Sequence, residues 1–127
     1  MIKCLLVGLG GFTGTIGRYL LGVVLAPVST KFPWSTLLIN FMGALLIGAI
    51  SAVSVRPKIL SPNLLLFLTV GICGGFTTFS TYSLETVKLL KEGRMFAGGM
   101  YAAGSVLLCL AGVMLGQALV TLLCSKS

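Results

Sequence analysis

The sequence contains no histidine and only two acidic residues, against nine lysines and arginines in a chain of 127 residues. The absence of histidine removes the side chain that most often shuttles protons or ligates metals near neutral pH. The chain also lacks a Ser/His/Asp set, a Cys/His pair and a glycine-rich phosphate loop. No enzymatic reaction is therefore indicated, and we expect that the protein is not an enzyme.

Charge is scarce in general. Charged residues make up 9% of the chain, whereas a typical soluble domain has about 25%. Hydrophobic residues make up 57%, and a soluble fold of this size could not remove so much apolar surface from water. The net charge of +7 could suggest nucleic acid. The basic residues, however, stand between apolar runs, where they suit loop anchoring and contact with anionic membrane lipid better. We expect an integral membrane protein with no nucleic-acid partner.

The four cysteines form no recognisable metal or redox motif. They stand at positions 4, 73, 109 and 124, in or beside apolar segments, and none forms a CxxC pair. Cysteines of this kind usually behave as small buried hydrophobic residues. The sequence therefore predicts that they are packing residues and neither disulfides nor metal ligands.

Four apolar segments are long enough to cross a membrane, which takes about 20 residues in a helix. Their approximate limits are 4–26, 36–55, 64–90 and 96–123. The segments between them are short and leave no room for a domain outside the membrane. The predicted fold is an all-α integral membrane protein, in which residues 1–127 form one domain of four transmembrane helices.

The third segment contains an unusual stretch, GICGGFTTFSTYS, at 71–83. Six of the seven residues from Thr77 to Ser83 carry a hydroxyl, and glycines stand at 71, 74 and 75. A broken helix is tolerated at membrane depth where it is buried in protein or lines a wet cavity, and its ends can bind ions. The alternative is a flexible kink in which Ser and Thr bond to preceding carbonyls. The density of glycine and hydroxyl favours a third helix that is broken mid-membrane.

The basic residues are divided equally between the two sides of the membrane. With four spans both termini share one side, and each side carries four lysines and arginines if Arg18 within the first span is left aside. The two sets are Lys3, Arg56, Lys58 and Lys126, and Lys31, Lys88, Lys91 and Arg94. The positive-inside rule then gives no orientation. Chance in a small count is one explanation, and an antiparallel dual-topology homodimer is the other.

Small residues four positions apart, which let helices approach closely, occur in three of the spans. They are Gly10–Gly14, Ala44–Gly48 and Gly112–Gly116.

Two polar residues within the first two spans have two possible roles each, because polar groups at membrane depth tend to face the protein interior. Arg18 could anchor its helix at the interface by snorkelling, or draw anions toward an aqueous vestibule. Asn40 shares a helix face with Thr36, Ala44 and Gly48. It could form an interhelical hydrogen bond or serve as a ligand.

Two further groups are open to a packing and a functional interpretation. Tyr101, Ser105 and Cys109 follow one another at helical spacing. They could be an interfacial tyrosine with a serine bonded to its own backbone, or a line of donors beside a pore. Phe79 and Tyr82 are three residues apart and share a face. They could pack together, or turn the positive edges of their rings toward an anion.

The two acids, Glu85 and Glu92, lie at or beyond the end of the third span, at helical spacing from Lys88, and could simply form interfacial ion pairs. No carboxylate lies in the first, second or fourth span. This disfavours the alternative function, a proton-coupled four-helix exporter of the small multidrug-resistance type. The remaining polar groups of the spans include hydroxyls, an amide, aromatic ring edges and an arginine. Such groups donate hydrogen bonds and favour the binding of a small anion.

The chain resembles the Fluc (CrcB-like) family of fluoride channels in four motifs. These are GGFTGTIGRY at 10–19, STLLINFMG at 35–43, GICGGFTTFSTYSLE at 71–85, and the pair Tyr101 and Ser105. The resemblance implies an antiparallel dual-topology homodimer in the bacterial plasma membrane, with two pathways for passive fluoride efflux that reduces fluoride toxicity. It also implies one structural sodium ion at the dimer centre, held by the main-chain carbonyls of Gly74 and Thr77.

The resemblance also implies which side chains line the fluoride pathway. They are Thr36, Asn40, Phe79, Ser80, Thr81, Tyr82, Tyr101 and Ser105, with Arg18 at the vestibule. Two positions depart from the family pattern. Tyr82 stands where a phenylalanine is expected, and its hydroxyl could donate to fluoride or alter the packing. Cys109 replaces a serine, which weakens one donor. The resemblance assigns no definite role to Arg18 or Glu85.

Overall fold

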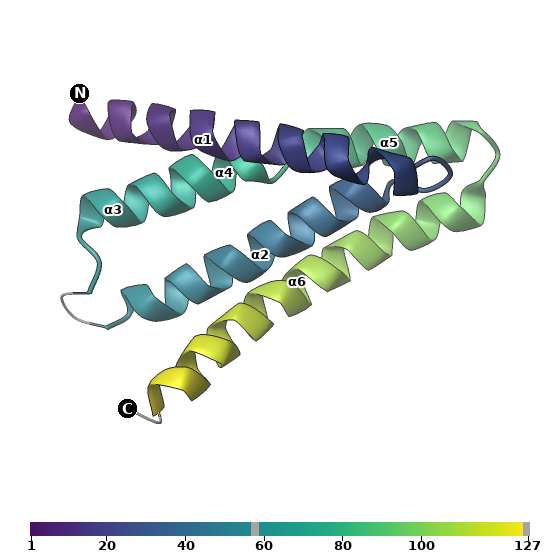
Figure 1. The fold of residues 1–127 in the computed structure, drawn as a ribbon. Helices are drawn as coiled ribbons and strands as arrows, with labels where there is room; N and C mark the ends of the chain where they lie inside the picture. Colours follow the sequence, from purple (N-terminus) through teal and green to yellow (C-terminus); the bar gives the residue numbers. More distant parts are fainter. Residues whose placement is uncertain (57–58, 126–127) are drawn as a thin grey trace.

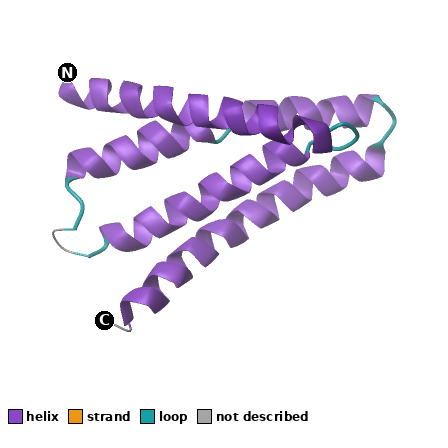
Figure 2. Ribbon diagram, in the orientation of Figure 1, coloured by secondary structure: helices purple, strands orange, loops and turns teal. Residues whose placement is uncertain are grey.

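A computed structural model of the chain describes residues 1–56 and 59–125, and all regular secondary structure in these two ranges is helical (Figure 2). Four helical segments are long and apolar enough to cross a membrane, namely Ile2–Val28, Trp34–Ser54, Pro62–Lys91 and Met95–Ser125. Each begins and ends within a few residues of the limits expected from the sequence. The chain is therefore a multi-pass membrane protein. Two of the eight basic residues counted for orientation, Lys58 and Lys126, lie outside the described ranges.

The helices are continuous in the first, second and fourth spans and subdivided in the third. In chain order they are α1 (Ile2–Leu25), a 3₁₀ turn η1 (Ala26–Val28), α2 (Trp34–Ser54), α3 (Pro62–Leu66), a π-helix η2 (Phe67–Cys73), α4 (Gly74–Phe76), α5 (Phe79–Lys91) and α6 (Met95–Ser125). Ser61 caps α3, because its side chain accepts a hydrogen bond from the Leu64 N–H at 3.2 Å. Gly93, with a φ of 76°, ends α5 in the left-handed conformation that glycine adopts without strain.

The spans run side by side, and both termini lie at the same end of the bundle (Figure 1). The connection from α1 to α2 and the one from α5 to α6 lie at the opposite end, as an even number of spans requires (Figure 1). Two of the spans pack mainly on helices that are distant in sequence, since α1 packs on η2 and α4, and α2 packs on α6. By contrast, α5 packs mainly on its neighbour in sequence, α6.

Two of these pairings depend on glycine. Gly10 and Gly14 are the buried residues of α1, and a Cβ at Gly14 would collide with the Ile72 carbonyl oxygen of η2. In the α2–α6 pair, a Cβ at Gly116 would collide with the Leu45 carbonyl oxygen. The small-residue spacings predicted from the sequence therefore bring helices of the same chain together, because only glycine lets two backbones come this close.

Replacing Gly14 with alanine is expected to destabilise the protein by about 2 kcal/mol, the usual cost of forcing a methyl group into a packed contact. The Cβ would lie 2.9 Å from the Phe76 backbone nitrogen as well as against Ile72, and main-chain atoms cannot move aside as a side chain would. The midpoint of thermal unfolding in detergent should fall. The matched control is Gly8→Ala on the same helix, where nothing lies within 4 Å, and it should leave the midpoint nearly unchanged.

Very few large side chains are fully buried, because most of the apolar surface faces outward. Among the described residues, the largest fully buried side chains are those of Tyr101 and Cys73. The prediction that the cysteines are small packing residues is confirmed for Cys73 and wrong for Cys4, which is exposed on the outer face of α1. Outward apolar surface of this extent fits a chain surrounded by lipid or by a second copy.

Candidate functional site

Two residues with extended backbone separate α4 from α5, and we call this pair, Thr77 and Thr78, the α4–α5 junction. Thr77 has φ −85° and ψ 156°, and Thr78 has φ −147° and ψ 112°. Thr78 also caps α5, since its hydroxyl oxygen accepts a hydrogen bond from the Thr81 N–H at 3.3 Å. The junction lies within the stretch of glycines and hydroxyls that the sequence singles out.

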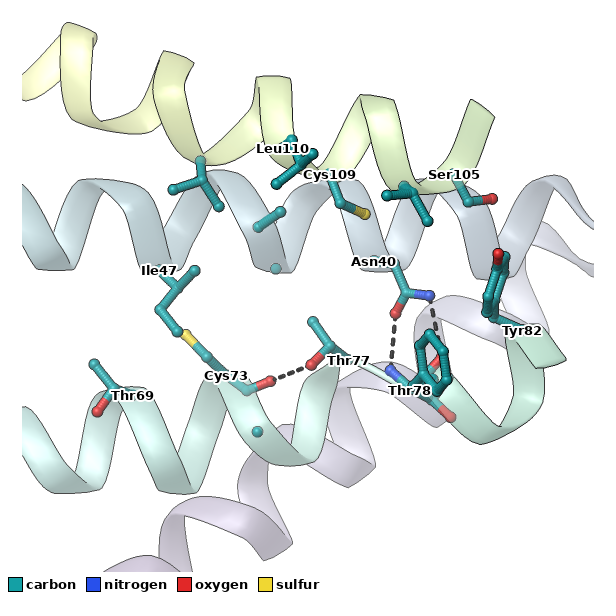
Figure 3. Close-up of a pocket in the computed structure, with 16 residues that line it drawn as sticks. Asn40, Ile47, Thr69, Cys73, Thr77, Thr78, Tyr82, Ser105, Cys109 and Leu110 are labelled. Atoms are coloured by element: carbon teal, nitrogen blue, oxygen red, sulfur yellow. Dashed lines mark hydrogen bonds between the residues drawn. The ribbon is translucent and has the colours of Figure 1, made fainter. Parts of the chain in front are cut away.

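Asn40 of α2 binds the main chain of the junction at two points. The Thr78 N–H donates to Asn40 Oδ1 at 2.8 Å, and Asn40 Nδ2 donates to the Thr78 carbonyl at 3.1 Å (Figure 3). The amide thereby pairs with the extended backbone as a neighbouring strand would. Of the two possible roles, the interhelical hydrogen bond is present. Because a carboxamide carries two N–H donors, one remains for another partner.

The same arrangement frees two backbone carbonyls. In a continuous helix the Thr78 N–H would donate to the Gly74 carbonyl, and the Thr81 N–H to the Thr77 carbonyl. Here the first donates to Asn40 and the second to the Thr78 hydroxyl. The carbonyl oxygens of Gly74 and Thr77 therefore lose their usual helical donors, and they are the two carbonyls that the family resemblance selects.

A third carbonyl at the end of α4 is bound from α1. The Gly75 carbonyl accepts hydrogen bonds from Arg18 Nε and from the Thr15 hydroxyl, each at 3.3 Å. A cation at the C-terminal end of a helix is favourable, because the unpaired carbonyls carry partial negative charge. Arg18 therefore contacts the protein backbone, which the sequence did not predict.

A cavity of about 430 Å³ opens beside the junction, between α2, the third span and α6 (Figure 3). Six of the residues predicted for ion binding line it: Asn40, Gly74, Thr77, Phe79, Tyr82 and Ser105. Cys109, predicted as a weak donor, lines it as well, and so do Cys73 and Thr69, which the sequence did not single out. No carboxylate is among the lining residues, so the polar groups of this cavity are hydroxyls, thiols, an amide and main-chain atoms.

Ser105 differs from the helical hydroxyls that bond to a carbonyl of their own helix. Five of them donate to the carbonyl four residues earlier, namely Thr13, Thr69, Ser83, Thr86 and Thr121. Ser105 is 4% exposed, and its hydroxyl has no hydrogen-bond partner in the described part of the chain. Buried hydroxyls are nearly always satisfied. Of the two interpretations from sequence, the serine bonded to its own backbone is therefore wrong, and a free donor stands at the cavity.

Glu85 is held by two hydroxyls from other helices. Tyr101, which is completely buried, donates to Glu85 Oε2 at 2.7 Å, and Thr36 donates to Glu85 Oε1 at 2.9 Å. The ion pairs that the sequence allows for Lys88 are absent from the described residues, where the ion pair present joins Glu92 and Arg94 at 3.9 Å. The partners of Glu85 come instead from α2 and α6 and not from its own helix. Tyr101 is therefore an internal hydrogen-bond donor and does not face the surroundings of the chain.

A second cavity, of about 310 Å³, contains the remaining predicted residues apart from Ser80 and Tyr101. It is lined by Arg18, Thr36, Thr81 and Thr78, among others. Since Thr78 lines both cavities, they adjoin at the α4–α5 junction. Ser80 lines neither of them, and its oxygen lies 3.3 Å from the Thr78 hydroxyl oxygen.

Two residues that organise this site were missed at the sequence level. Thr78 was counted only among the hydroxyls, although its backbone is the partner of Asn40. For Glu85 the sequence offers only an interfacial ion pair with Lys88, and the family motif assigns it no definite role. A Thr at the start of a helical run is a capping signal that could have located Thr78. No sequence signal gives the partners of Glu85, because they lie on two other helices.

The fold and the site define a small four-span helical membrane protein with adjoining cavities at a non-helical junction. Comparison with known proteins gives the family. A sequence model described as "CrcB-like protein, Camphor Resistance (CrcB)" matches residues 5–117. The chain belongs to this CrcB-like family, as the motifs predicted.

Several bacterial relatives resemble the chain over most of its length. A protein of Chlorobium phaeobacteroides is 48% identical over 109 residues, which cover 84% of this chain and 85% of the relative. One of Geobacter sulfurreducens is 45% identical over 117 residues, covering 91% and 94%. One of Chlorobium luteolum is 46% identical over 105 residues, covering 83% and 81%. Each of these relatives bears the name "Fluoride-specific ion channel FluC".

Proposed function

We propose that the chain forms a fluoride-selective channel that lets fluoride leave the cell passively across the plasma membrane and so limits its toxicity. The names of the relatives support this function. The structural observation that carries it is the unpaired Ser105 hydroxyl in a cavity that also holds Asn40 and contains no carboxylate. Hydrogen bonds from such donors to an anion are stronger than those between neutral groups. Fluoride, a small anion and a strong acceptor, suits them.

The direct test is ion release from liposomes that contain the purified protein, with fluoride and chloride measured side by side. Fluoride release should be fast and electrogenic, and chloride release negligible. Equal release of the two anions would refute selectivity. Absence of any ion flux would refute the channel, and proton flux that depends on an added drug would favour a multidrug exporter.

We further propose that the channel is an antiparallel dual-topology homodimer with two fluoride pathways. In a single chain, Ser80 is exposed and Arg18 is only half-buried. Polar groups that face lipid at membrane depth are costly, so a second protein surface is needed to cover these two residues. An inverted copy of the chain would also explain the equal division of basic residues. On this proposal, the α4–α5 junction lies at mid-membrane and breaks the third helix there.

Topology can be tested with a cysteine at Thr30, which is exposed in the α1–α2 connection. The four native cysteines are first replaced by alanine, and retained fluoride flux shows that this background is intact. In sealed cells, an impermeant thiol reagent should label about half of the Thr30→Cys protein, and the remainder only after the membrane is opened. Labelling of all or none of the protein from outside would refute dual topology.

We also propose one structural sodium ion at the centre of the dimer, bound by the carbonyls of Gly74 and Thr77. These two oxygens suit sodium, because carbonyl oxygens are good ligands for a hard cation and both lack their usual helical hydrogen-bond donors. Two carbonyls from each of two chains would give four oxygen ligands. When bound, the ion would neutralise the partial charges of these carbonyls and join the two copies, while Asn40 keeps the junction extended.

Sodium removal is therefore expected to destabilise the dimer. A ligand that binds only the folded state raises stability with its concentration, by about 2.7 kcal/mol at 100 times its dissociation constant. The midpoint of thermal unfolding should rise as sodium replaces N-methyl-D-glucamine at constant ionic strength, and fluoride flux should fall without sodium. A midpoint and a flux that do not depend on sodium would contradict the proposed site.

A further inference from the structure

The hydroxyl of Tyr82 is engaged by the protein itself. Tyr82 lies on α5 and lines the larger cavity, and its hydroxyl donates to the Ala102 carbonyl of α6 at 2.9 Å. A phenol has a single O–H hydrogen, so a hydroxyl bound in this way has only lone pairs left for the cavity. Lone pairs repel an anion. Of the two roles open to this tyrosine from the sequence, donation to fluoride is therefore incompatible with the observed hydrogen bond.

The ring of Tyr82 is held between two other rings. Its centroid lies 5.3 Å from that of Phe79, at an interplanar angle of 45°, and 5.4 Å from that of Tyr101, at 49°. Both spacings fall within the favourable range for aromatic pairs. Tyr101 is buried and bound to Glu85, so it is a fixed neighbour. Phe79 is mostly exposed, so among these rings it depends on Tyr82 for its position.

Apart from Asn40 at the junction and the two hydroxyls bound to Glu85, the part of α5 that carries these rings is held by few packed side chains. Leu89 is the buried residue of α5, and it lies near the end of the helix, far from Phe79. A helix with so few buried side chains is weakly anchored, because packing supplies most of the stability of helices in proteins. A hydrogen bond from Tyr82 to α6 therefore matters more here than it would in a well-packed helix.

We propose that Tyr82 is a positioning residue, whose hydroxyl tethers α5 to α6 and thereby holds Phe79 in place at the cavity. The proposal rests on the proposed fluoride function, since it states how one residue of that pathway acts. It assigns to Tyr82 a role that a phenylalanine at the same position cannot have. The hydroxyl acts through Phe79 and does not touch the ion.

The test is Tyr82→Phe, compared with Thr121→Val as the control. Thr121 is exposed on α6 and lines neither cavity, and its hydroxyl donates within its own helix, to the Gln117 carbonyl at 2.9 Å. In liposomes, Tyr82→Phe should lower the maximal fluoride flux severalfold without changing the fluoride concentration that gives half-maximal flux. Its midpoint of thermal unfolding should fall by a few degrees. Thr121→Val should change neither the flux nor the half-saturating concentration, and should leave the unfolding midpoint nearly constant.

Two other outcomes would overturn the proposal. If the hydroxyl bound the anion, the half-saturating fluoride concentration would rise about tenfold or more, because a hydrogen bond to a charged group would be lost. If the tether were only structural, the unfolding midpoint would fall while flux and half-saturation stayed the same.

An independent measurement is NMR of protein labelled with ¹³C at the tyrosine ring carbon that bears the hydroxyl. The chain has three tyrosines, and the Tyr82 resonance is the one missing from Tyr82→Phe. It should stay in place during a fluoride titration, and movement at saturating fluoride would overturn the proposal. If the parent protein does not conduct fluoride, the proposed function fails, while NMR and thermal unfolding still report whether the tether exists.

Discussion

Replacing Asn40 with aspartate is expected to reduce fluoride flux about 100-fold, which corresponds to ~2.7 kcal/mol. A carboxylate can accept the hydrogen bond from the Thr78 N–H, but it cannot donate to the Thr78 carbonyl, which Asn40 does at 3.1 Å. It also lacks the second N–H donor and puts a negative charge beside the cavity. Each change alone costs about 1–3 kcal/mol, so their combination makes this the largest effect we expect.

The matched control is Asn63→Asp, because Asn63 is the other asparagine of the chain. Asn63 is exposed in the first turn of α3, where a carboxylate is favourable next to the positive end of the helix. Its substitution should leave fluoride flux within about twofold of the parent. Fluoride flux through Asn40→Asp liposomes equal to that of the parent, with the dimer intact by size-exclusion chromatography, would remove Asn40 from the pathway.

Replacing Phe79 with isoleucine is expected to lower fluoride flux about tenfold with little change in stability. Phe79 is 77% exposed in the single chain, so its ring is not part of a packed core. Isoleucine keeps the apolar surface but lacks the positive ring edge. A tenfold loss corresponds to about 1.4 kcal/mol. The loss should appear in liposome flux, and the midpoint of thermal unfolding should stay nearly constant.

Phe12→Ile provides the comparison for this substitution. Phe12 is 68% exposed on α1, and it lines neither of the two cavities at the junction. Both its flux and its unfolding midpoint should match the parent. A Phe79→Ile variant that conducts like the parent would show that the ring edge does not act on the ion.

The four spans and the unusual third segment could be predicted from the sequence, because apolar length and composition are properties of one segment at a time. The stretch at 71–83 indeed contains the α4–α5 junction. The identity of the residues around the cavity also followed from the family motifs. These predictions needed no knowledge of how the helices face one another.

Contacts between helices were harder to predict, because they depend on the rotation and register of each helix. Asn40 binds the backbone of Thr78, 38 positions away, and Thr36 binds Glu85, 49 positions away. The acceptor for Tyr82 is a main-chain carbonyl, which every residue possesses, so nothing in the sequence marks Ala102. Periodicity shows which residues share a face, but not which face meets which.

The pairing of α1 with η2 and α4 has a consequence for biosynthesis. Since α1 packs little on α2, the glycine face of Gly10 and Gly14 finds its surface only after residue 76 has been made. Chains are synthesised at about 5–20 residues per second, so the first two spans enter the membrane seconds before that surface exists. The direction in which the first helices insert is therefore set before α1 can pack on η2 and α4. A nascent chain with balanced charge would be free to enter either way.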